Sequence, residues 1–198
     1  MSKTIVVTGA SAGFGAATAR RFAAEGWRVV ATARRRERLE ALAEELGGPD
    51  RVHILGIDMR DRAAVTEDRS GSLPATFDEP DVLVNNAGIG RGLEPAWESD
   101  LDEWEAMVDT NVKGLLYATR AVLPGMVARE RGHIVDLGSI AGRWPYPGGN
   151  VYGGTKAFIA QFSRNLRADL LGTRVRVCVA TWSRGFAENG VLRPPFPW

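Results

Sequence analysis

The sequence has little of what metal, disulfide or nucleic-acid chemistry requires. Its 198 residues include one cysteine, Cys178, and two histidines. A single cysteine excludes an internal disulfide and a cysteine metal cluster, and two histidines with one cysteine offer no zinc site. The formal net charge of +1 provides no basic excess for a nucleic-acid partner. We therefore expect neither a metal nor a nucleic acid.

Long apolar runs are missing as well. The apolar stretch near the N-terminus, TIVV, is too short for a signal peptide or a membrane span. Hydrophobic residues make up 44% of the chain and charged residues 25%, as in an ordinary globular protein. The length suits one domain with a sizeable core. We expect a single cytoplasmic domain over residues 1–198, with no membrane contact.

What the chain does contain is a regular alternation of short apolar runs and helical patterns. Strands are predicted over 3–8, 27–32, 51–56, 81–86, 133–138 and 174–179, and helices over 13–25, 36–46, 101–127 and 151–171. The weakest segment, 68–80, is predicted to be a frayed helix end and a loop. Near-continuously apolar strands are typical of a parallel sheet covered on both faces. The pattern predicts an α/β fold, a doubly wound Rossmann-type sheet in three αβα layers.

A glycine-rich turn follows the first predicted strand and precedes the first predicted helix. Its glycines are Gly9, Gly13 and Gly15, a wider spacing than G-x-G-x-x-G. Glycines permit the tight turn and let a phosphate approach the backbone, while the helix N-terminus supplies free N–H groups and a positive dipole. At the first strand-to-helix junction, this turn predicts a dinucleotide site.

The end of the second predicted strand indicates which dinucleotide binds. NAD sites usually carry an acidic residue there, which bonds the ribose hydroxyls. This chain has Arg34, Arg35 and Arg36 instead. The alternative is a basic patch on a solvent-exposed helix face that binds no ligand, but cations at a helix N-terminus oppose the helix dipole. An anionic partner fits better, so we predict that the 2′-phosphate of NADP lies there.

Tyr152 and Lys156 are four residues apart within a predicted helix. This spacing puts both side chains on one face, within reach of each other. Such pairs are common on helix surfaces, so the spacing alone is no evidence of chemistry. It gains weight from the dinucleotide site predicted in the same domain.

Taken together, the motifs resemble the short-chain dehydrogenase/reductase family. They are TGASAGFG at 8–15, NNAG at 85–88, Asn111 in DTNVKG, Ser139 in LGS and the YGGTK run, and the resemblance extends from the start of the chain to about residue 177. The stretches ATARRRERL and GRWPYPGGNVYGGTKAF further resemble the NADP-dependent 3-hydroxy acid dehydrogenases, which act on serine, allo-threonine and 3-hydroxypropionate. The resemblance implies an oxidoreductase that moves a hydride between NADP and a small hydroxy acid or carbonyl substrate.

The resemblance also implies four catalytic residues. Tyr152 would be the general acid/base, although its free pKa of about 10 is too high for a base near neutral pH. A Lys156 ammonium roughly 4 Å away contributes about 4 kcal/mol at an effective dielectric of ~20, or about three pKa units, which is the shift required. Lys156 would also bond the nicotinamide ribose. Ser139 would bond the substrate oxygen, and Asn111 would hold a water that relays protons to Lys156.

Ordinary structural roles remain open for two of these residues and for one other. Ser139 could be a strand-end serine in a turn, and Asn111 could bond a local carbonyl in a helix kink. Asp58 resembles the adenine-binding aspartate of the family, but it could also cap a helix. Asn85 is expected to be structural. The cofactor contacts that the resemblance implies are Gly9, Ala10, Ser11, Ala12, Gly13, Phe14, Gly15, Arg34, Arg35, Asp58, Met59, Asn86, Ala87, Gly88, Tyr152 and Lys156.

The loop RWPYPGGN lies between Ser139 and Tyr152 and should touch the substrate. We hypothesise that Arg143, or an arginine elsewhere, pairs with a substrate carboxylate; Trp144 and Tyr146 are expected to be packing residues. A serine hydrolase is excluded, because Ser139 is not in G-x-S-x-G and both histidines precede it.

The C-terminus departs from the family pattern. Residues 178–198 lack the Pro-Gly motif and the last strand of the family. If the gene is read one base later, codons for residues 181–183 can encode Pro-Gly, and codons for residues 189–193 can encode Thr-Glu-Phe-Ser. We hypothesise a frameshifted ending, which resequencing the gene would test. The alternative function is a catalytically impaired cofactor-binding or scaffold protein derived from a truncated dehydrogenase. The helices 101–127 and 151–171 resemble the family's oligomer-forming pair, so a homodimer or homotetramer is expected.

Overall fold

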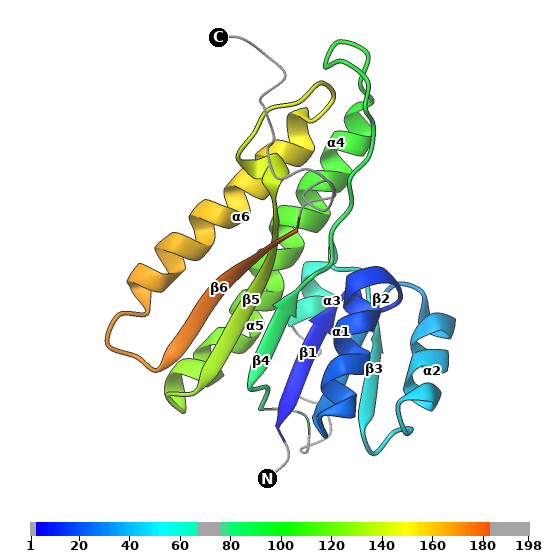
Figure 1. Ribbon diagram of the computed structural model, residues 1–198, viewed down its shortest axis with the longest axis vertical. Coiled ribbons are helices and arrows are strands. Elements are labelled where there is room, and N and C mark those ends of the chain that lie inside the picture. Colours follow the sequence, from blue (N-terminus) through cyan, green and yellow to red (C-terminus); the bar gives the residue numbers. More distant parts are fainter. Residues whose placement is uncertain (1–2, 67–76, 78, 183–198) are drawn as a thin grey trace, which may run out of the picture.

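A computed structural model describes residues 3–66, 77 and 79–182. Its described strands form one parallel sheet in the order β3-β2-β1-β4-β5-β6 (Figure 1). Their bounds are β1 Thr4–Thr8, β2 Arg28–Ala33, β3 Val52–Gly56, β4 Val82–Asn85, β5 Gly132–Ser139 and β6 Val175–Trp182. The chain order reverses between β1 and β4, and open α/β sheets bind ligands at the carboxyl ends of the strands beside such a switch point.

Helices cover the sheet on both faces, which confirms the predicted Rossmann-type fold. On the face turned toward the viewer in Figure 1, the helices are α1 Gly13–Ala24 and α2 Arg36–Glu45, which lie over β1–β3. The opposite face carries α3 Arg62–Thr66, α5 Gly114–Ala128 and α6 Asn150–Asp169. Helix α4, Leu101–Val108, precedes α5 and extends beyond the carboxyl ends of the strands.

The core consists of two apolar layers because successive strand residues point to opposite faces of the sheet. On β1, Ile5 and Val7 pack with α1 and α2, whereas Val6 packs with α5 and α6. All five residues of β1 are buried. The alternation therefore explains why the central strands read as continuous apolar runs.

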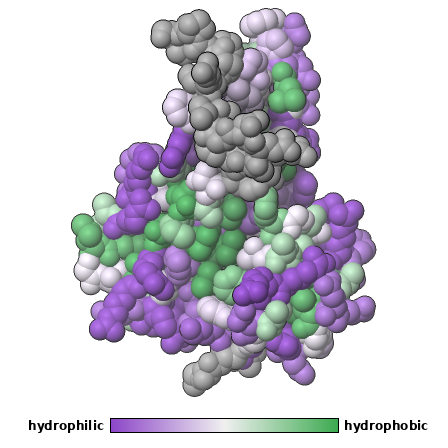
Figure 2. All heavy atoms as spheres, in the orientation of Figure 1, coloured by the Kyte–Doolittle hydropathy of each residue, from purple (hydrophilic) through white to green (hydrophobic). Residues whose placement is uncertain are grey.

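The helical cover differs along the sheet, and in the described part of the chain β5 is covered by helices on one face only. This strand alternates buried and half-buried residues. In the described part of the chain, no helix lies over β5 and β6 on the face turned toward the viewer in Figure 1, and apolar surface gathers at the middle of that face in Figure 2. Val135 and Leu137 are half-buried on that side. The helices on this face, α1 and α2, lie over β1–β3 only.

Most predicted boundaries differ from the structure by one or two residues, and the largest differences concern one helix and one strand. The helix predicted over 101–127 is interrupted by a π-helical segment, Asp109–Lys113, between α4 and α5. Strand β6 continues to Trp182 rather than Val179, because it pairs with β5 along its whole length. Of the predicted loop 68–80, only Phe77, Glu79 and Pro80 are described, and the tail from residue 183 lies outside the described residues. Among the described helices, none is long and apolar enough to cross a membrane.

Candidate active site

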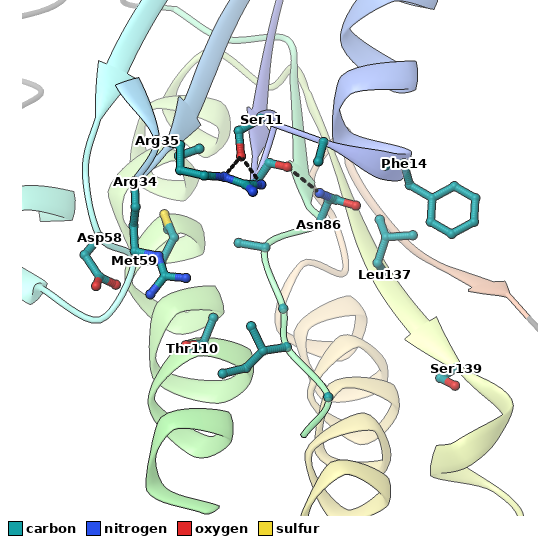
Figure 3. A pocket seen from close by; sticks show the side chains of 18 of the residues that line it. Ser11, Phe14, Arg34, Arg35, Asp58, Met59, Asn86, Thr110, Leu137 and Ser139 are labelled. Atoms are coloured by element: carbon teal, nitrogen blue, oxygen red, sulfur yellow. Dashed lines mark hydrogen bonds between the residues drawn. The ribbon is translucent and has the colours of Figure 1, made fainter. Parts of the chain in front are cut away.

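A cleft of about 420 Å³ opens at the carboxyl ends of the strands. Its walls come from the loop between β1 and α1, the ends of β2, β3 and β5, the segment after β4, and α6. Figure 3 shows side chains from these distant segments turned toward one space. The fold therefore assembles the site at the position expected for a doubly wound sheet.

Two glycines let the first loop lie directly against the segment after β4. Gly9 has φ +69°, and a Cβ there would lie 2.9 Å from the Ala87 Cα. A Cβ on Gly15 would lie 2.4 Å from the Gly9 carbonyl oxygen and 2.5 Å from the Asn86 Nδ2. Asn86 fixes this contact, since its Nδ2 donates to the Thr8 carbonyl at 2.8 Å. The loop thus leaves its backbone accessible beside the start of α1, where a phosphate would bind.

The predicted basic residues lie on the same cleft. Arg35 donates to the Ser11 Oγ from its NH2 nitrogen at 2.9 Å and from Nε at 3.3 Å (Figure 3). This contact ties the end of β2 to the glycine loop. Arg34 also lines the cleft, near Asp58 (Figure 3). A pair of guanidinium groups beside a phosphate loop is suited to a second phosphate on the same ligand.

Asp58 lies at the end of β3 and is paired with Arg60, whose guanidinium approaches to 2.7 Å. Hydrogen bonding to Arg60 lowers the pKa of the Asp58 carboxyl, with smaller contributions from the Arg60 and Arg34 charges. The alternative in which Asp58 caps a helix is wrong. Asp61 accepts from the Ala64 N–H at 3.1 Å and caps α3 instead.

Tyr152 and Lys156 share the face of α6 that is turned toward β5 and the cleft. The Lys156 Nζ lies 5.8 Å from the centre of the Tyr152 ring and donates to the Leu137 carbonyl at 2.7 Å. Lys156 is only 7% exposed. Burial lowers the pKa of Lys156 to about 8, and the charge of Asp136 acts in the opposite direction. The lysine is therefore mostly cationic at neutral pH, which is the state that assists a tyrosine base.

Ser139 ends β5 and lines the cleft together with Tyr152 and Lys156. Its Oγ accepts from the Ala141 N–H at 3.1 Å, which begins the short 3₁₀ helix Ile140–Gly142. Within the described residues, the Ser139 hydroxyl donates no hydrogen bond, so its proton can be directed to an oxygen in the cleft. Ser139 therefore combines the turn role considered from the sequence with a place on the wall of the cleft.

Asn111 lies within the π-helical segment and is 1% exposed. Its Oδ1 accepts from the Ile89 N–H at 2.8 Å, and its Nδ2 donates to the Ile89 carbonyl at 2.8 Å and to the Thr155 Oγ1 at 3.1 Å. The alternative of a bond to a local carbonyl is wrong, because Ile89 is far away in the sequence. The side chain instead joins the segment after β4 to α6.

Most of the residues predicted from the sequence line this one cleft, but three do not. Ala10, in the glycine loop, and Gly15, at the start of α1, are buried and face away from the cleft, and Asn111 is bound to Ile89 behind the wall of the cleft. Asn85 is structural as expected, since its Nδ2 donates to Thr119 and Asp136. Sequence reasoning missed the lining residues Ala33, Ile57, Ile89, Gly90, Thr110, Leu137 and Gly138. Ala33, Leu137 and Gly138 lie at the carboxyl ends of β2 and β5, and Ile57 follows β3, so position at a strand end was the available signal for these four.

A second cavity, of about 250 Å³, adjoins the first on the β6 side. The two share Gly138, Ser139 and Lys156. Arg143 lines the second cavity together with Arg164 and Arg167, and no carboxylate is among its lining residues in the described part of the chain. The cavity beside Ser139 is therefore basic. In the described residues, no group of three or more His, Cys, Asp or Glu side chains could hold a metal ion.

This fold and this set of polar groups define a nicotinamide-type oxidoreductase site, and comparison with known proteins identifies the class. The model of the short chain dehydrogenase family matches residues 3–182, slightly beyond the expected limit near 177. The chain belongs to the short-chain dehydrogenase family, whose members are oxidoreductases acting on CH–OH groups.

Within that family the chain is similar to several characterised proteins. It is 60% identical over 173 residues to the NADP-dependent 3-hydroxy acid dehydrogenase YdfG of Salmonella typhi, covering 87% of this chain and 68% of that protein. It is 53% identical over 177 residues to serine 3-dehydrogenase of Agrobacterium fabrum, covering 89% of this chain and 70% of the relative. Sulfoacetaldehyde reductase 2 of Chromohalobacter salexigens is 52% identical over 178 residues, covering 89% of this chain and 70% of that protein.

Solved structures agree with these relatives. Serine dehydrogenase from Escherichia coli superposes with a TM-score of 0.86 at 57% identity, over 89% of this chain and 80% of that one. The closed form of a serine dehydrogenase complexed with NADP⁺ gives 0.87 at 56% identity, over 90% of this chain and 71% of the other.

Proposed function

We propose that this protein transfers a hydride between NADP and the carbinol carbon of a small 3-hydroxy acid such as serine, allo-threonine or 3-hydroxypropionate. One observation carries the proposal: Ser139, Tyr152 and Lys156 line the same cleft as the glycine loop, Arg34 and Arg35. The similarity to NADP-dependent 3-hydroxy acid and serine dehydrogenases supports the substrate class.

The residues present fit this cofactor. Gly9 and Gly13 line the cleft with φ values of +69° and +55°, a conformation that glycine adopts readily and that keeps side chains off the loop, and Arg34 and Arg35 provide cations for a 2′-phosphate on the same cleft. When bound, NADP supplies the hydride acceptor or donor. The protein's own groups would hold the phosphates on the loop and at the start of α1, and Asp58 and Met59 would flank the adenine.

The proton chemistry falls to three side chains. In the oxidation direction, the Tyr152 phenolate, which the nearby Lys156 ammonium stabilises, accepts the proton of the substrate hydroxyl and becomes a neutral phenol. Ser139 donates a hydrogen bond to the reacting oxygen as its charge changes. Asn111 holds Ile89 and Thr155 in place behind the reacting groups. In the reduction direction, Tyr152 returns the proton.

The first test is a titration with NADPH and, separately, with NADH. Energy transfer from the chain's 6 tryptophans to the reduced nicotinamide reports binding. Saturable binding that favours NADPH, followed by turnover of serine or 3-hydroxypropionate, is the expected result. Binding without turnover of any hydroxy acid would instead support the catalytically impaired cofactor-binding protein.

The two arginines at the end of β2 should set the preference for NADPH. In the double variant Arg34→Gln/Arg35→Gln, NADPH should bind about 30-fold more weakly, since hydrogen bonds to charged groups contribute about 1.5–3 kcal/mol each and these side chains are partly solvated. NADH affinity should change less than about twofold, because its ribose carries no 2′-phosphate. Arg38→Gln, on α2 but outside the cleft, is the control. An equal loss for both coenzymes would contradict the assignment.

Arg143 should bind the acid group of the substrate. A carboxylate in 3-hydroxy acids and a sulfonate in sulfoacetaldehyde both place an anion near the reacting carbon, and Arg143 lines the basic cavity next to Ser139. Arg143→Gln should raise KM for serine about tenfold with kcat within about threefold, as loss of one exposed charged hydrogen bond predicts. Arg174→Gln, an exposed arginine before β6, should leave KM unchanged. An unchanged KM in Arg143→Gln would remove this residue from the substrate site.

A further inference from the structure

Two ionisable side chains are buried in the described part of the chain, and they are neighbours in the fold. Asp136 is fully buried on β5, and Lys156 is 7% exposed on α6. Asp136 immediately precedes Leu137, whose carbonyl accepts the hydrogen bond from the Lys156 Nζ. The proposed reaction uses Lys156 and gives no role to Asp136.

The neighbours of Asp136 hold its carboxylate without neutralising it. The Ser163 Oγ donates at 2.6 Å to Oδ2, and the Asn85 Nδ2 donates at 2.8 Å to Oδ1. Asn85 also donates to the Thr119 Oγ1 at 3.0 Å. Ser163 lies two turns after Lys156 on the same buried face of α6. Both donors to the carboxylate are uncharged, so its positive partner must come from elsewhere.

We propose that Asp136 is the buried counter-charge that keeps Lys156 in its ammonium form, and thereby acts as a positioning residue for the tyrosine–lysine pair. A buried charge is tolerated when an opposite charge lies close by, and these two are the oppositely charged pair in the described core. The role in catalysis rests on the proposed function, whereas the pairing itself does not.

The electrostatics of both groups agree with this geometry. Burial lowers the pKa of Lys156 to about 8, and the Asp136 charge is the influence that raises it. Burial raises the pKa of Asp136, and the Lys156 charge lowers it, after the hydrogen bonds from Ser163 and Asn85. Each group therefore favours the charged form of the other, as coupled sites must.

Other titratable groups around the pair do not supply a second buried anion. On β6, burial raises the pKa of the Cys178 thiol, so the thiol is neutral at pH 7, and Arg176 is a cation. On the π-helical segment, Asp109 is bound to Lys113 at 2.7 Å and is partly exposed. The remaining titratable groups on the elements packed around the pair are His133 on β5, Arg143 after the 3₁₀ helix, Tyr152, Arg164, Arg167 and Asp169 on α6, Tyr117 and Arg120 on α5, and Asp102, Glu103 and Glu105 on α4.

Lysine-selective ¹³C labelling tests the pairing directly. The chain has only three lysines, Lys3, Lys113 and Lys156, so NMR can follow each side chain through a pH titration, with Lys156→Met to assign the third signal. In Asp136→Asn, the midpoint of the Lys156 pH titration should fall by about one pH unit below its value in the parent protein, because an opposite charge has been removed. Lys3 and Lys113 serve as internal controls. The measurement requires neither cofactor nor turnover.

Two matched variants separate charge from packing. Ser163→Ala removes a hydrogen bond to Asp136 but keeps the charge, so the Lys156 midpoint should stay within about 0.3 pH units. Asp136→Glu keeps the charge and should also preserve most of the midpoint. Equal shifts in Asp136→Asn and Ser163→Ala, or no shift in Asp136→Asn, would overturn the proposal. The fold can accommodate Asp136→Asn, because the Asn85 Oδ1 has no hydrogen-bond partner among the described residues and can accept from the new amide.

A reciprocal measurement covers the case in which Asp136→Asn does not fold. A raised native pKa means that the folded state holds the Asp136 proton more tightly than the unfolded state, so the unfolding free energy falls as pH rises through that pKa. In Lys156→Met the Asp136 carboxylate has no counter-charge, so the decrease in unfolding free energy between pH 4 and pH 7 should be larger than in the parent protein. Lys156 stays mostly protonated in both states over this range, so its loss adds little pH dependence of its own. An identical fall in both proteins would overturn the pairing.

Discussion

Replacing Tyr152 by phenylalanine should lower kcat for serine about 10³-fold, while NADPH affinity stays within about threefold of the parent value. The change removes only the hydroxyl that exchanges the proton. The aromatic ring remains against Gly90, at the wall of the cleft. Because binding and proton transfer depend on different atoms, the two measurements should separate cleanly.

Tyr146→Phe is the matched control for this variant. Tyr146 is also close to the start of α6, but it lies outside the cofactor cleft. Steady-state kinetics and the energy-transfer titration should show parent-like values for both kcat and NADPH affinity. A Tyr152→Phe protein that keeps a tenth or more of the parent kcat would show that another group carries the proton.

Replacing Gly15 by alanine should both destabilise the fold and abolish tight cofactor binding. The new Cβ would lie 2.4 Å from the Gly9 carbonyl oxygen and 2.5 Å from the Asn86 Nδ2, so the backbone of the loop has to move. Overpacking of this kind costs about 3 kcal/mol of unfolding free energy. For a domain of this size, that corresponds to a Tm lower by about 10 °C. NADPH should bind about 100-fold more weakly, because the displaced loop is the one that would hold the phosphates.

Gly154→Ala distinguishes steric conflict from a general effect of removing glycine. A Cβ at Gly154 meets nothing within 4 Å, and the residue lies on the exposed side of α6. This substitution should raise the unfolding free energy by up to about 1 kcal/mol, as alanine does in a helix. Urea unfolding and thermal unfolding of the two variants should therefore shift in opposite directions. Parent-like stability of Gly15→Ala would show that the loop relaxes without strain.

Much of the site could be located from the sequence because its residues lie at strand ends. The glycine loop follows β1, Asp58 and Met59 follow β3, and Ser139 ends β5. In a parallel sheet the carboxyl ends of all strands meet at one edge, so residues far apart along the chain are brought to one cleft. Local periodicity also predicted the helix that carries Tyr152 and Lys156.

Contacts between segments with no local signature could not be predicted in this way. The Leu137 carbonyl accepts the hydrogen bond from Lys156, and Asn111 is bound to Ile89. Both pairings depend on how α6 and the π-helical segment pack on the sheet, which local sequence does not show. The cap of α3 by Asp61 rather than Asp58 depends on the turn in which Arg60 binds the Asp58 carboxylate. The sequence also could not show that no described helix lies over one face of β5 and β6, because an apolar strand has the same pattern whether one face or both are covered.

The sequence by itself determined the class of fold, the phosphate loop and the pairing of tyrosine with lysine, because each depends on residues close together in the chain. The tertiary structure alone decided the electrostatic state of the site. Asp136 lies near no catalytic motif residue except Ser139 in the sequence, yet the packing of α6 on β5 buries it beside Lys156, with Ser163 and Asn85 as hydrogen-bond donors. Burial and the distance between charges set a pKa, and both are properties of the folded chain rather than of any segment of it.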